Sequence, residues 1–526
     1  MLRLARRLSL AVFLLVPAGA SAGPSTCPGL VGLRLPNLTV TVAEAVTSGS
    51  FTPPGEKPLT GLPPFCRLSG VLRPSSDSSI AIEVWMPASG WNHRFQGGGN
   101  GGFAGSIAWE GLARNVGRGY ATAATDTGHQ GSGIDASWAL GHPEKVVDFG
   151  HRAIHEMTVA AKAVIAAYYG EGARRSYFAS CSNGGRQALM EAQRHPGDYD
   201  GIVAGAPAAP WTTLMAVFGW NARALGGPAS HVPPAKLEAV ERAVLAACDA
   251  KDGVVDGVVA DPPKCAFDPR SLLCTAGDGP GCLTAPQAEA LARVYAGPRT
   301  RDGRRVGRGF PPGGETGPGG WGLWINGEAP GRSVQAMVAA GFGANMVFGR
   351  PDWDPLTFDV DRDLPIAREK AAAALDATDP DLEPFRSRGG KLILFHGWND
   401  AAIPAGLTID YVDAVRARLG AGPTDSFLRL YLVPGQQHCG GGPGASDCGG
   451  LNAASGDARH DLSTALEKWV EEGVAPGTMI AVRPADGTTP AGKTPMTRPL
   501  CPYPTAAVYR GAGSPDDPSS YHCEVR

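Results

Sequence analysis

The segment 180–184, SCSNG, presents Ser182 between small residues at a point where the pattern of the chain changes. Residues 176–180 predict a strand, and the residues after Ser182 predict a helix that runs to about His195. A nucleophile elbow places a serine on such a strand-to-helix turn, with small residues two positions before and after it. Ser180 replaces the glycine that is usual at the first position, but it is still small. Because a helix N-terminus favours a developing negative charge, Ser182 is the predicted nucleophile.

Two further residues follow predicted strands in the order that such a site requires, which is nucleophile, acid and histidine. Asp400 comes just after the predicted strand 391–395, and His438 comes just after the predicted strand 427–433. Sheets of this kind present catalytic side chains at the carboxyl ends of their strands. His438 would take the proton of Ser182, and Asp400 would orient the imidazole and stabilise its charged form. Each residue alone is more often a cap or a turn residue, but the order of the three favours a triad.

A cysteine adjoins two of these residues, because Cys181 precedes Ser182 and Cys439 follows His438. If the two cysteines are bonded, their Cα atoms lie within about 7 Å and hold nucleophile and base together. The alternative is that Cys181 is itself a thiol nucleophile, which an oxidising compartment disfavours. The chain has 11 cysteines, so a disulfide framework leaves one over. Their spacing is not that of a zinc site.

The N-terminus has the three-part pattern of a signal peptide in residues 1–22. A basic start is followed by a short apolar run, residues 8–16, and by the small residues Ala20, Ser21 and Ala22. The apolar run is too short for a membrane anchor, which needs about 20 residues. We therefore expect a secreted or periplasmic protein with no membrane anchor in its mature form. A net charge of −3, with both signs interspersed, argues against a nucleic-acid partner.

The pattern of strand, turn, helix and strand over residues 176–206 is a βαβ unit, which implies a parallel sheet. This rhythm is lost over residues 208–388, where Pro, Gly and Trp are frequent, and it resumes at residue 391. We predict an α/β-hydrolase fold with a mostly parallel central sheet and a large inserted lid domain at 208–388. The catalytic domain would comprise residues 23–207 and 389–526. The 526 residues and an apolar content of 43% suit so large a core.

A glycine-rich segment, residues 97–102, comes after the predicted strand 80–86. Such a loop can cradle a phosphate or supply backbone amides to an oxyanion, and a plain turn is the alternative. No Lys followed by Ser or Thr comes after it, which excludes a Walker phosphate-binding loop. A dinucleotide-binding loop is disfavoured because no helix pattern begins directly after it.

An acidic loop in the lid contains Asp249, Asp252 and Asp256 together with two glycines. Carboxylates this dense repel each other unless a cation neutralises them. Ca²⁺ prefers 6–8 oxygen ligands, and the backbone carbonyls of Val254 and Val258 would add to the carboxylates. The spacing differs from an EF-hand and the loop has no His, so we predict a structural calcium clip. A solvated Asp-Gly turn is the alternative.

Two other groups of side chains suggest roles but have plainer explanations. His129, His151 and His155 lack evident carboxylate or cysteine company, so they are predicted to be structural and not metal ligands. Aromatic residues of the lid are candidates for an apolar acyl pocket, but such residues more often belong to the core. For Trp324 the pocket and the core are equally strong predictions. They are Trp211, Trp220, Trp321, Trp324, Phe342 and Phe348.

These motifs resemble the tannase and feruloyl esterase family, whose signature (CS-D-HC) joins a Cys-Ser pair, an Asp and a His-Cys pair. Cys181-Ser182, Asp400 and His438-Cys439 match it. The similarity extends over nearly the whole mature chain. It includes residues 178–186 (FASCSNGGR), 199–207 (YDGIVAGAP), 434–443 (PGQQHCGGGP) and 498–504 (RPLCPYP).

The resemblance implies the roles of several further residues. The oxyanion amides would come from Asn183 and Gly102, and the acidic loop would bind Ca²⁺. A disulfide would link the triad, and Cys448 would stay single. The implied pairs are Cys27–Cys66, Cys181–Cys439, Cys248–Cys265, Cys274–Cys282 and Cys501–Cys523.

The resemblance also implies esters of aromatic acids as substrates, because family members cleave galloyl, feruloyl or terephthaloyl esters. In the terephthalate enzyme, a lid arginine some distance after a tryptophan resembling Trp324 holds the free carboxylate. Here only Arg332 falls between Trp324 and Phe348, and it is not clearly placed for that task. We therefore expect a plant phenolic ester, free or attached to polysaccharide or tannin. A terephthalate monoester hydrolase, a serine peptidase on the same fold and a calcium-stabilised binding protein without activity are the alternatives.

Overall fold

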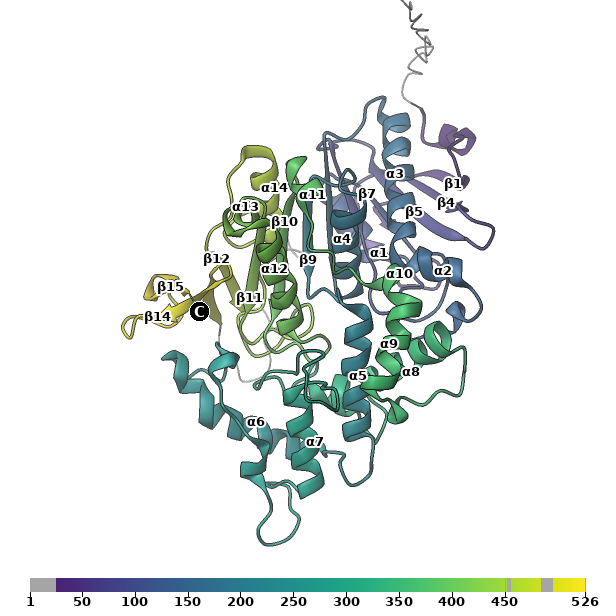
Figure 1. The fold of residues 1–526 in the computed structure, drawn as a ribbon. Coiled ribbons are helices and arrows are strands. Elements are labelled where there is room, and N and C mark those ends of the chain that lie inside the picture. The colour runs from purple at the N-terminus through teal and green to yellow at the C-terminus, as the bar shows by residue number, and fades with distance from the viewer. Residues whose placement is uncertain (1–24, 450, 452–455, 484–494, 526) are drawn as a thin grey trace, which may run out of the picture.

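Nine strands form one central sheet within residues 25–449, 451, 456–483 and 495–525, which the computed structural model describes (Figure 1). Their order across the sheet is β1-β4-β5-β7-β6-β8-β9-β10-β11. The strands are β1 Leu38–Val46, β4 Phe65–Leu72, β5 Ile80–Pro87, β6 Arg94–Gly98, β7 Ala121–Thr125, β8 Arg175–Cys181, β9 Gly201–Gly205, β10 Lys391–Gly397 and β11 Leu428–Val433.

The sheet is mostly parallel, as the sequence predicts. Five neighbouring pairs, from β7-β6 to β10-β11, are parallel. Three pairs at the β1 edge are antiparallel. β9 is buried along its whole length, which explains why its sequence is a continuous apolar run and does not alternate with polar residues.

Helices cover both faces of this sheet (Figure 1). Because side chains alternate between the faces of a strand, Phe178 packs in the cluster with α3, α4 and α12, whereas Tyr177 packs with α14. Helix α1 covers β5 and β7 on the side of Trp85. These helices are α1 Trp109–Gly117, α3 Ala153–Tyr169, α4 Asn183–Arg194, α12 Ala405–Leu419 and α14 Leu462–Glu472.

A long helical segment connects β9 to β10, which are neighbours in the sheet. This segment is described throughout and contributes no strand to the central sheet. Figure 1 shows α5 to α9 gathered at one end of the molecule. Its division from the rest at residues 208 and 388 stays a prediction. The helices are α5 Trp211–Leu225, α6 Pro234–Cys248, α7 Ala285–Ala296, α8 Val334–Phe342, α9 Val360–Ala367, α10 Ala373–Leu375 and α11 Glu383–Ser387.

The glycine-rich segment was expected to be a loop after the strand 80–86. A further strand lies between the two. The first part of the segment belongs to this strand, β6, which pairs with β7 and β8. Gly97 lies within this strand, and a larger residue would not fit there because the Tyr199 hydroxyl occupies the place of a Cβ. The oxyanion-type loop therefore starts only after Gly98.

The remaining elements are short. Two lie near the helical layers, α2 Pro143–Val147 and α13 Ala421–Asp425. Three two-stranded sheets are formed by β2 Ser50–Phe51 with β3 Leu59–Thr60, β12 Met479–Arg483 with β13 Met496–Leu500, and β14 Thr505–Tyr509 with β15 Tyr521–Val525. The predicted signal peptide, residues 1–22, lies outside the described residues. None of the described helices combines the length and the apolar character needed to cross a bilayer.

Candidate active site

Ser182 occupies the turn between β8, which ends at Cys181, and α4, which begins at Asn183. Its backbone has φ 66° and ψ −127°, a conformation that residues other than glycine rarely adopt. The Ser182 N–H donates to the Gly205 carbonyl at 2.9 Å, and the Ser182 carbonyl accepts from the Arg186 N–H at 3.1 Å. The chain thus forms the strained elbow that the sequence predicts.

Two glycines after Ser182 make this turn possible. A Cβ at Gly184 would collide with the Ser180 hydroxyl, and a Cβ at Gly185 would collide with the Gly205 carbonyl. The Ser180 side chain fits at its position because it faces Gly184, which has no side chain. The departure from the usual glycine therefore leaves the elbow intact.

Cys181 and Cys439 form a disulfide with their Cα atoms 6.0 Å apart. This bond brings the elbow and the loop after β11 together, so Ser182 and His438 lie on adjoining segments. It also removes the alternative of a cysteine nucleophile, because the Cys181 sulfur is not a thiol.

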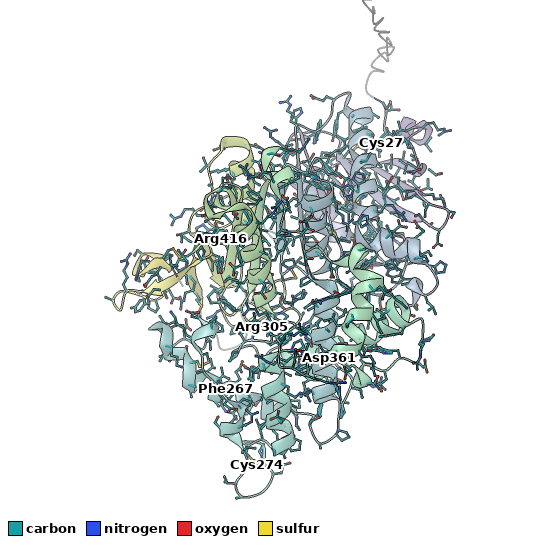
Figure 2. The ribbon with its side chains drawn as sticks, viewed as in Figure 1. Cys27, Phe267, Cys274, Arg305, Asp361 and Arg416 are labelled. Atoms are coloured by element: carbon teal, nitrogen blue, oxygen red, sulfur yellow. A yellow bond between two sulfur atoms is a disulfide. The ribbon has the colours of Figure 1, made fainter. Side chains whose placement is uncertain are left out.

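The other cysteines pair as the resemblance implies, in Cys27–Cys66, Cys248–Cys265, Cys274–Cys282 and Cys501–Cys523. Figure 2 shows Cys27 at one end of the molecule and Cys274 at the opposite end, so the bonds are spread over the fold. Cys448 is free and buried, and burial raises the pKa of its thiol to about 12.

Asp400 and His438 are hydrogen-bonded to each other. The distance from His438 Nδ1 to Asp400 Oδ2 is 2.8 Å. The other carboxylate oxygen of Asp400 accepts from the backbone N–H groups of Ala402 and Ile403, both at 2.8 Å. Asp400 is 2% exposed, and the His438 side chain is 12% exposed. The carboxylate is therefore fixed and the imidazole is held by its Nδ1, which leaves Nε2 for a proton transfer.

His396 is a residue of this site that the sequence analysis did not assign. Its Nε2 lies 3.3 Å from Asp400 Oδ2, and its Nδ1 is 2.8 Å from the Thr408 hydroxyl. Burial alone would raise the pKa of Asp400, but His438 and His396 outweigh it and hold this pKa below its usual range. The carboxylate thus stays charged beside His438. The position of His396 in a buried strand gave no sign of this contact.

The backbone amides predicted to bind an oxyanion come from two adjoining segments. Asn183 is the first residue of α4, where a helix leaves N–H groups without intrahelical partners. Gly102 lies in the loop after β6 with φ 54°, and a Cβ there would collide with the Gly133 carbonyl. The Asn100 N–H donates to Gln187 Oε1 at 2.9 Å, which ties this loop to α4. The loop is thereby held against the elbow.

A cavity of about 830 Å³ lies between α1 and the strands β6, β7 and β8, and it reaches the elbow at Ser180 and Cys181 without including Ser182 or His438 in its wall. Its wall includes residues 98–101 of the loop and Cys181, together with Trp109 at the start of α1 and Lys57 in the β2–β3 hairpin. Ligands of α/β proteins bind at the carboxyl ends of strands, and the volume lies in the usual range for a ligand cavity.

The model of the family described as tannase and feruloyl esterase matches residues 66–524. The chain belongs to this family. It is therefore a carboxylic ester hydrolase of the feruloyl esterase and tannase type, on an α/β-hydrolase fold.

Three similar proteins illustrate how closely this esterase follows the family. An uncharacterized esterase of Xanthomonas campestris pv. campestris is 43% identical over 97% of this chain and 92% of its own. Mono(2-hydroxyethyl) terephthalate hydrolase of Piscinibacter sakaiensis is 35% identical over 89% of this chain and 86% of its own. The crystal structure of feruloyl esterase B from Aspergillus oryzae superposes with a TM-score of 0.86, at 29% identity over 95% of this chain and 99% of that one.

Among the predicted pocket aromatics, all of them in the described part of the chain, Trp324 has a ring that contacts His438. Its ring centroid lies 5.2 Å from that of His438, at an interplanar angle of 70°. Trp324 is half-buried and packs on an apolar cluster that includes Phe103, next to Gly102, and Ile403, close to Asp400. In contrast, Trp321 is buried in the core, while Arg332 is exposed on the turn before α8.

The acidic loop is closed by its own backbone. Asp252 accepts from the N–H groups of Val254 and Ala260 at 2.9 and 3.1 Å, and Asp249 accepts from that of Gly257 at 3.0 Å. Burial raises the pKa of Asp252 to about 6, and the neighbouring acidic charges add to the effect. The carboxylates are therefore held close together at an electrostatic cost.

Asp256, the third carboxylate of this loop, forms an ion pair with Arg498 of β13, which the sequence analysis did not foresee. The guanidinium of Arg483 also faces Asp256. The donors of the loop are all oxygens, the ligand set of Ca²⁺, so their chemistry fits a hard divalent cation. Among the described residues, however, the three carboxylates do not converge to within 4.8 Å of one another.

Proposed function

We propose that this protein is a secreted serine esterase that releases aromatic, phenolic acids such as ferulic or gallic acid through an acyl-enzyme. The single observation that carries the proposal is the disulfide Cys181–Cys439, which joins the strained Ser182 elbow to the His438–Asp400 pair.

In the first half-reaction, Ser182 Oγ attacks the ester carbonyl carbon while His438 Nε2 takes its proton. The carbonyl oxygen becomes an oxyanion that accepts hydrogen bonds from the N–H groups of Gly102 and Asn183. The carbon–oxygen bond to the alcohol then breaks, and the alcohol leaves with the proton from His438.

In the second half-reaction, His438 takes a proton from water, and the resulting hydroxide attacks the acyl-enzyme. The second oxyanion collapses, the bond to Ser182 Oγ breaks, and Ser182 recovers its proton from His438. Asp400 supports both halves because its carboxylate, bonded to His438 Nδ1, stabilises the imidazolium each time it forms.

The acid and the alcohol of the substrate would occupy different places. The half-buried Trp324 ring beside His438 suits an aromatic acyl group. The cavity of about 830 Å³ beside Cys181 has a wall of mixed polar and apolar character that includes the Trp109 ring, which would suit a sugar as the alcohol. A ferulate esterified to arabinose would occupy part of both places.

A terephthalate monoester is the second candidate, favoured by the 35% identity to a mono(2-hydroxyethyl) terephthalate hydrolase. Such a substrate carries a free carboxylate that needs a cation. Arg332, the arginine between Trp324 and Phe348, is exposed on the turn before α8. A phenolic ester is therefore the stronger proposal.

Export is part of the proposal. Five disulfides are typical of proteins that fold in an oxidising compartment, outside the cell or in the periplasm. A periplasmic or culture-medium location of activity, lost when residues 1–22 are deleted, would support it.

A structural calcium ion in the lid also belongs to the proposal. Asp249, Asp252 and Asp256 would bind it with the backbone carbonyls of Val254 and Val258. The ion would neutralise the carboxylates and hold the loop in one conformation, with no part in the chemistry.

An ester panel tests the proposed activity: methyl ferulate, methyl gallate, a terephthalate monoester and ferulate esterified to arabinose. Ser182→Ala should abolish acid release with the fold retained, and release at the wild-type rate would show that the assignment is wrong. Preferential release of amines from peptides would favour a peptidase. Trp109→Ala should weaken turnover of the arabinose ester but not of methyl ferulate. That difference would indicate that the cavity binds the alcohol part of the substrate.

A further inference from the structure

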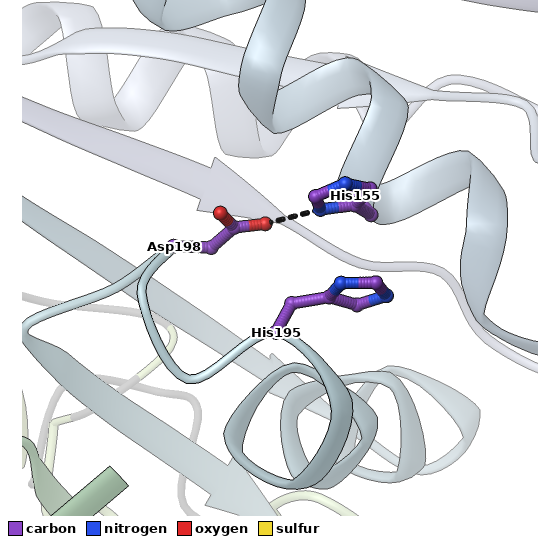
Figure 3. Close-up of side chains that lie close together, drawn as sticks. All are labelled: His155, His195 and Asp198. Atoms are coloured by element: carbon purple, nitrogen blue, oxygen red, sulfur yellow. Dashed lines mark hydrogen bonds and ion pairs between the residues drawn. The ribbon is translucent and has the colours of Figure 1, made fainter. Parts of the chain in front are cut away.

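Three side chains far from the triad meet on the α3–α4 side of the sheet (Figure 3). His155 lies on α3, His195 follows the last turn of α4, and Asp198 lies in the loop before β9. His155 Nδ1 is 2.6 Å from Asp198 Oδ2, and the rings of His155 and His195 are stacked with centroids 3.8 Å apart. The prediction that His155 has no carboxylate company is therefore wrong, because the fold supplies Asp198 from 43 residues away.

Two buried imidazole nitrogens around this cluster, His195 Nε2 and His151 Nδ1, find no hydrogen-bond partner in the described part of the chain. Buried polar groups are nearly always satisfied, so these nitrogens are available to a ligand. The buried carboxyl group of Glu191, by contrast, pairs with that of Asp198. Glu191 lies one helical turn before His195 and close to Asp198.

We propose that His155, His195 and Asp198 form a binding site for a divalent transition metal, Zn²⁺ being the ion that best fits two imidazoles and one carboxylate. Imidazole nitrogen and carboxylate oxygen are established zinc ligands at 2.0–2.2 Å. Neither the family resemblance nor the proposed esterase activity requires this site.

The donor atoms lie near one another, but they are farther apart than the ligands of a bound zinc ion. They all lie within 4.8 Å of one another, whereas ligands of a tetrahedral zinc are about 3.4 Å apart. The stacked rings are nearly parallel, so the half-exposed His195 ring has to rotate to direct a nitrogen at the ion. The other cluster of this kind among the described residues, Cys274, Asp278 and Cys282, has its sulfurs in a disulfide and cannot bind in the same way.

The local charges also suit a cation. The carboxyl groups of Asp198 and Glu191 face the ammonium of Lys162, which donates to the Asp198 backbone carbonyl. Two guanidinium groups also lie near, that of Arg194 beside His195 and that of Arg388 beside Lys162, so a cation here would compete with them for the carboxylates. The bond to Asp198 raises the pKa of His155, and burial raises the pKa of Glu191. A metal would replace the proton on His155, so its binding releases protons.

The consequence of the site would be mechanical. The ion would join α3, the end of α4 and the start of β9, and α4 carries Ser182 at its other end. Because α4 has 12 residues, the ion would lie about 18 Å from the nucleophile. It would stabilise the helix behind the elbow and leave the acyl transfer itself unchanged.

Calorimetric titration of the full chain with ZnCl₂ tests the proposal, in calcium-saturated buffer at about pH 7.5. We expect one Zn²⁺ per chain and a higher melting temperature. His155→Gln and His195→Gln should each weaken binding about tenfold or more. His460→Gln is the matched control, because His460 also pairs with an aspartate, Asp457 at 2.7 Å, but has no second imidazole in its pair. It should bind as the wild type does.

Wild-type protein that binds no Zn²⁺, or a His195→Gln variant that binds as tightly as wild type, would overturn the proposal and leave water as the partner of these atoms. If a variant does not fold, Co²⁺ binding to the wild type decides the matter. Visible absorption of nitrogen-ligated Co²⁺, displaced by Zn²⁺, supports the site, and its absence excludes it.

Discussion

Gln437 Nε2 donates a hydrogen bond to the Thr316 carbonyl at 2.9 Å, and the Gly319 N–H donates to Gln437 Oε1 at 3.1 Å. Gln437 directly precedes His438. Asn399, which directly precedes Asp400, donates from its side-chain amide to the Gly313 carbonyl. The inserted segment is thus bonded to the chain neighbours of both His438, the proposed base, and Asp400, the proposed acid. Its position and that of the proposed triad are linked.

Gln437→Ala should lower kcat about tenfold for every ester, because a small displacement of His438 misaligns the proton transfer. Loss of both bonds also costs about 1–3 kcal/mol of stability. Steady-state kinetics and thermal melting measure the two effects. Gln436→Ala is the control, since its side chain donates to the Ser446 carbonyl and not to the inserted segment. Equal losses in both variants would contradict the link.

Removing the disulfide beside the triad, as Cys181→Ala with Cys439→Ala, should reduce both stability and turnover. A native disulfide is worth about 2–5 kcal/mol, and a long loop gives the larger effect in the chain-entropy account. This one closes 258 positions, whereas Cys274–Cys282 closes 8. The double variant of Cys274 and Cys282 should therefore keep full kcat, and a comparable loss of kcat in both would show that the triad disulfide has no special role.

Trp324→Ala should lower kcat/KM for methyl ferulate about tenfold and leave the hydrolysis of an acetate ester nearly unchanged. The reason is that the ring beside His438 would contact the aromatic acyl group of the proposed substrate, whereas an acetyl group would be too small to reach it. Trp324→Phe should restore most of the activity. A parallel loss on both esters would assign Trp324 to the support of His438 and not to the substrate.

Chelation of calcium should lower the melting temperature. An ion that binds only the folded state contributes about 2.7 kcal/mol at a concentration 100 times its Kd. Asp252→Asn should abolish the response to calcium, whereas Asp268→Asn, at an exposed helix start after the loop, should keep it. If calcium and a chelator give the same melting curve for the wild type, the calcium clip is wrong.

Much of the fold follows from local patterns that tertiary contacts reinforce. The strands β8, β9, β10 and β11 were predictable because each is an apolar run that ends at a turn. The segment 94–98 was not, because glycines in β6 disfavour a strand by propensity. Its place between β7 and β8, and the Tyr199 hydroxyl against Gly97, decide its conformation.

The geometry of the proposed site was predictable where chain neighbours mark it. Ser182 and His438 are marked by the adjoining cysteines, but the contacts of His396 and Gln437 exist only in the folded chain. The same holds for His155, whose partner Asp198 lies 43 positions away. Sequence spacing reports local turns well and long-range pairs poorly, because pairing across the sheet depends on strand order.

Glu315 lies in the inserted segment that bonds to Asn399 and Gln437, and its side chain is fully buried. It accepts from the Tyr295 hydroxyl at 2.8 Å and from the Gly313 N–H at 3.0 Å. Burial raises the pKa of Glu315 to about 7, although these hydrogen bonds oppose the shift. In the unfolded chain a glutamate has a pKa of about 4.3.

Between these two pKa values the folded chain holds a proton that the unfolded chain has lost. The free energy of unfolding therefore falls as the pH rises through about 4 to 7, by about 4 kcal/mol at most, and this loss is complete above the folded pKa. Glu315→Gln has no such proton, so its stability relative to wild type should rise from about pH 5 to about pH 8. Denaturant unfolding at several pH values measures this, with the exposed Glu289→Gln as control. A difference between Glu315→Gln and wild type that does not change with pH would mean that Glu315 is charged in the fold throughout this range.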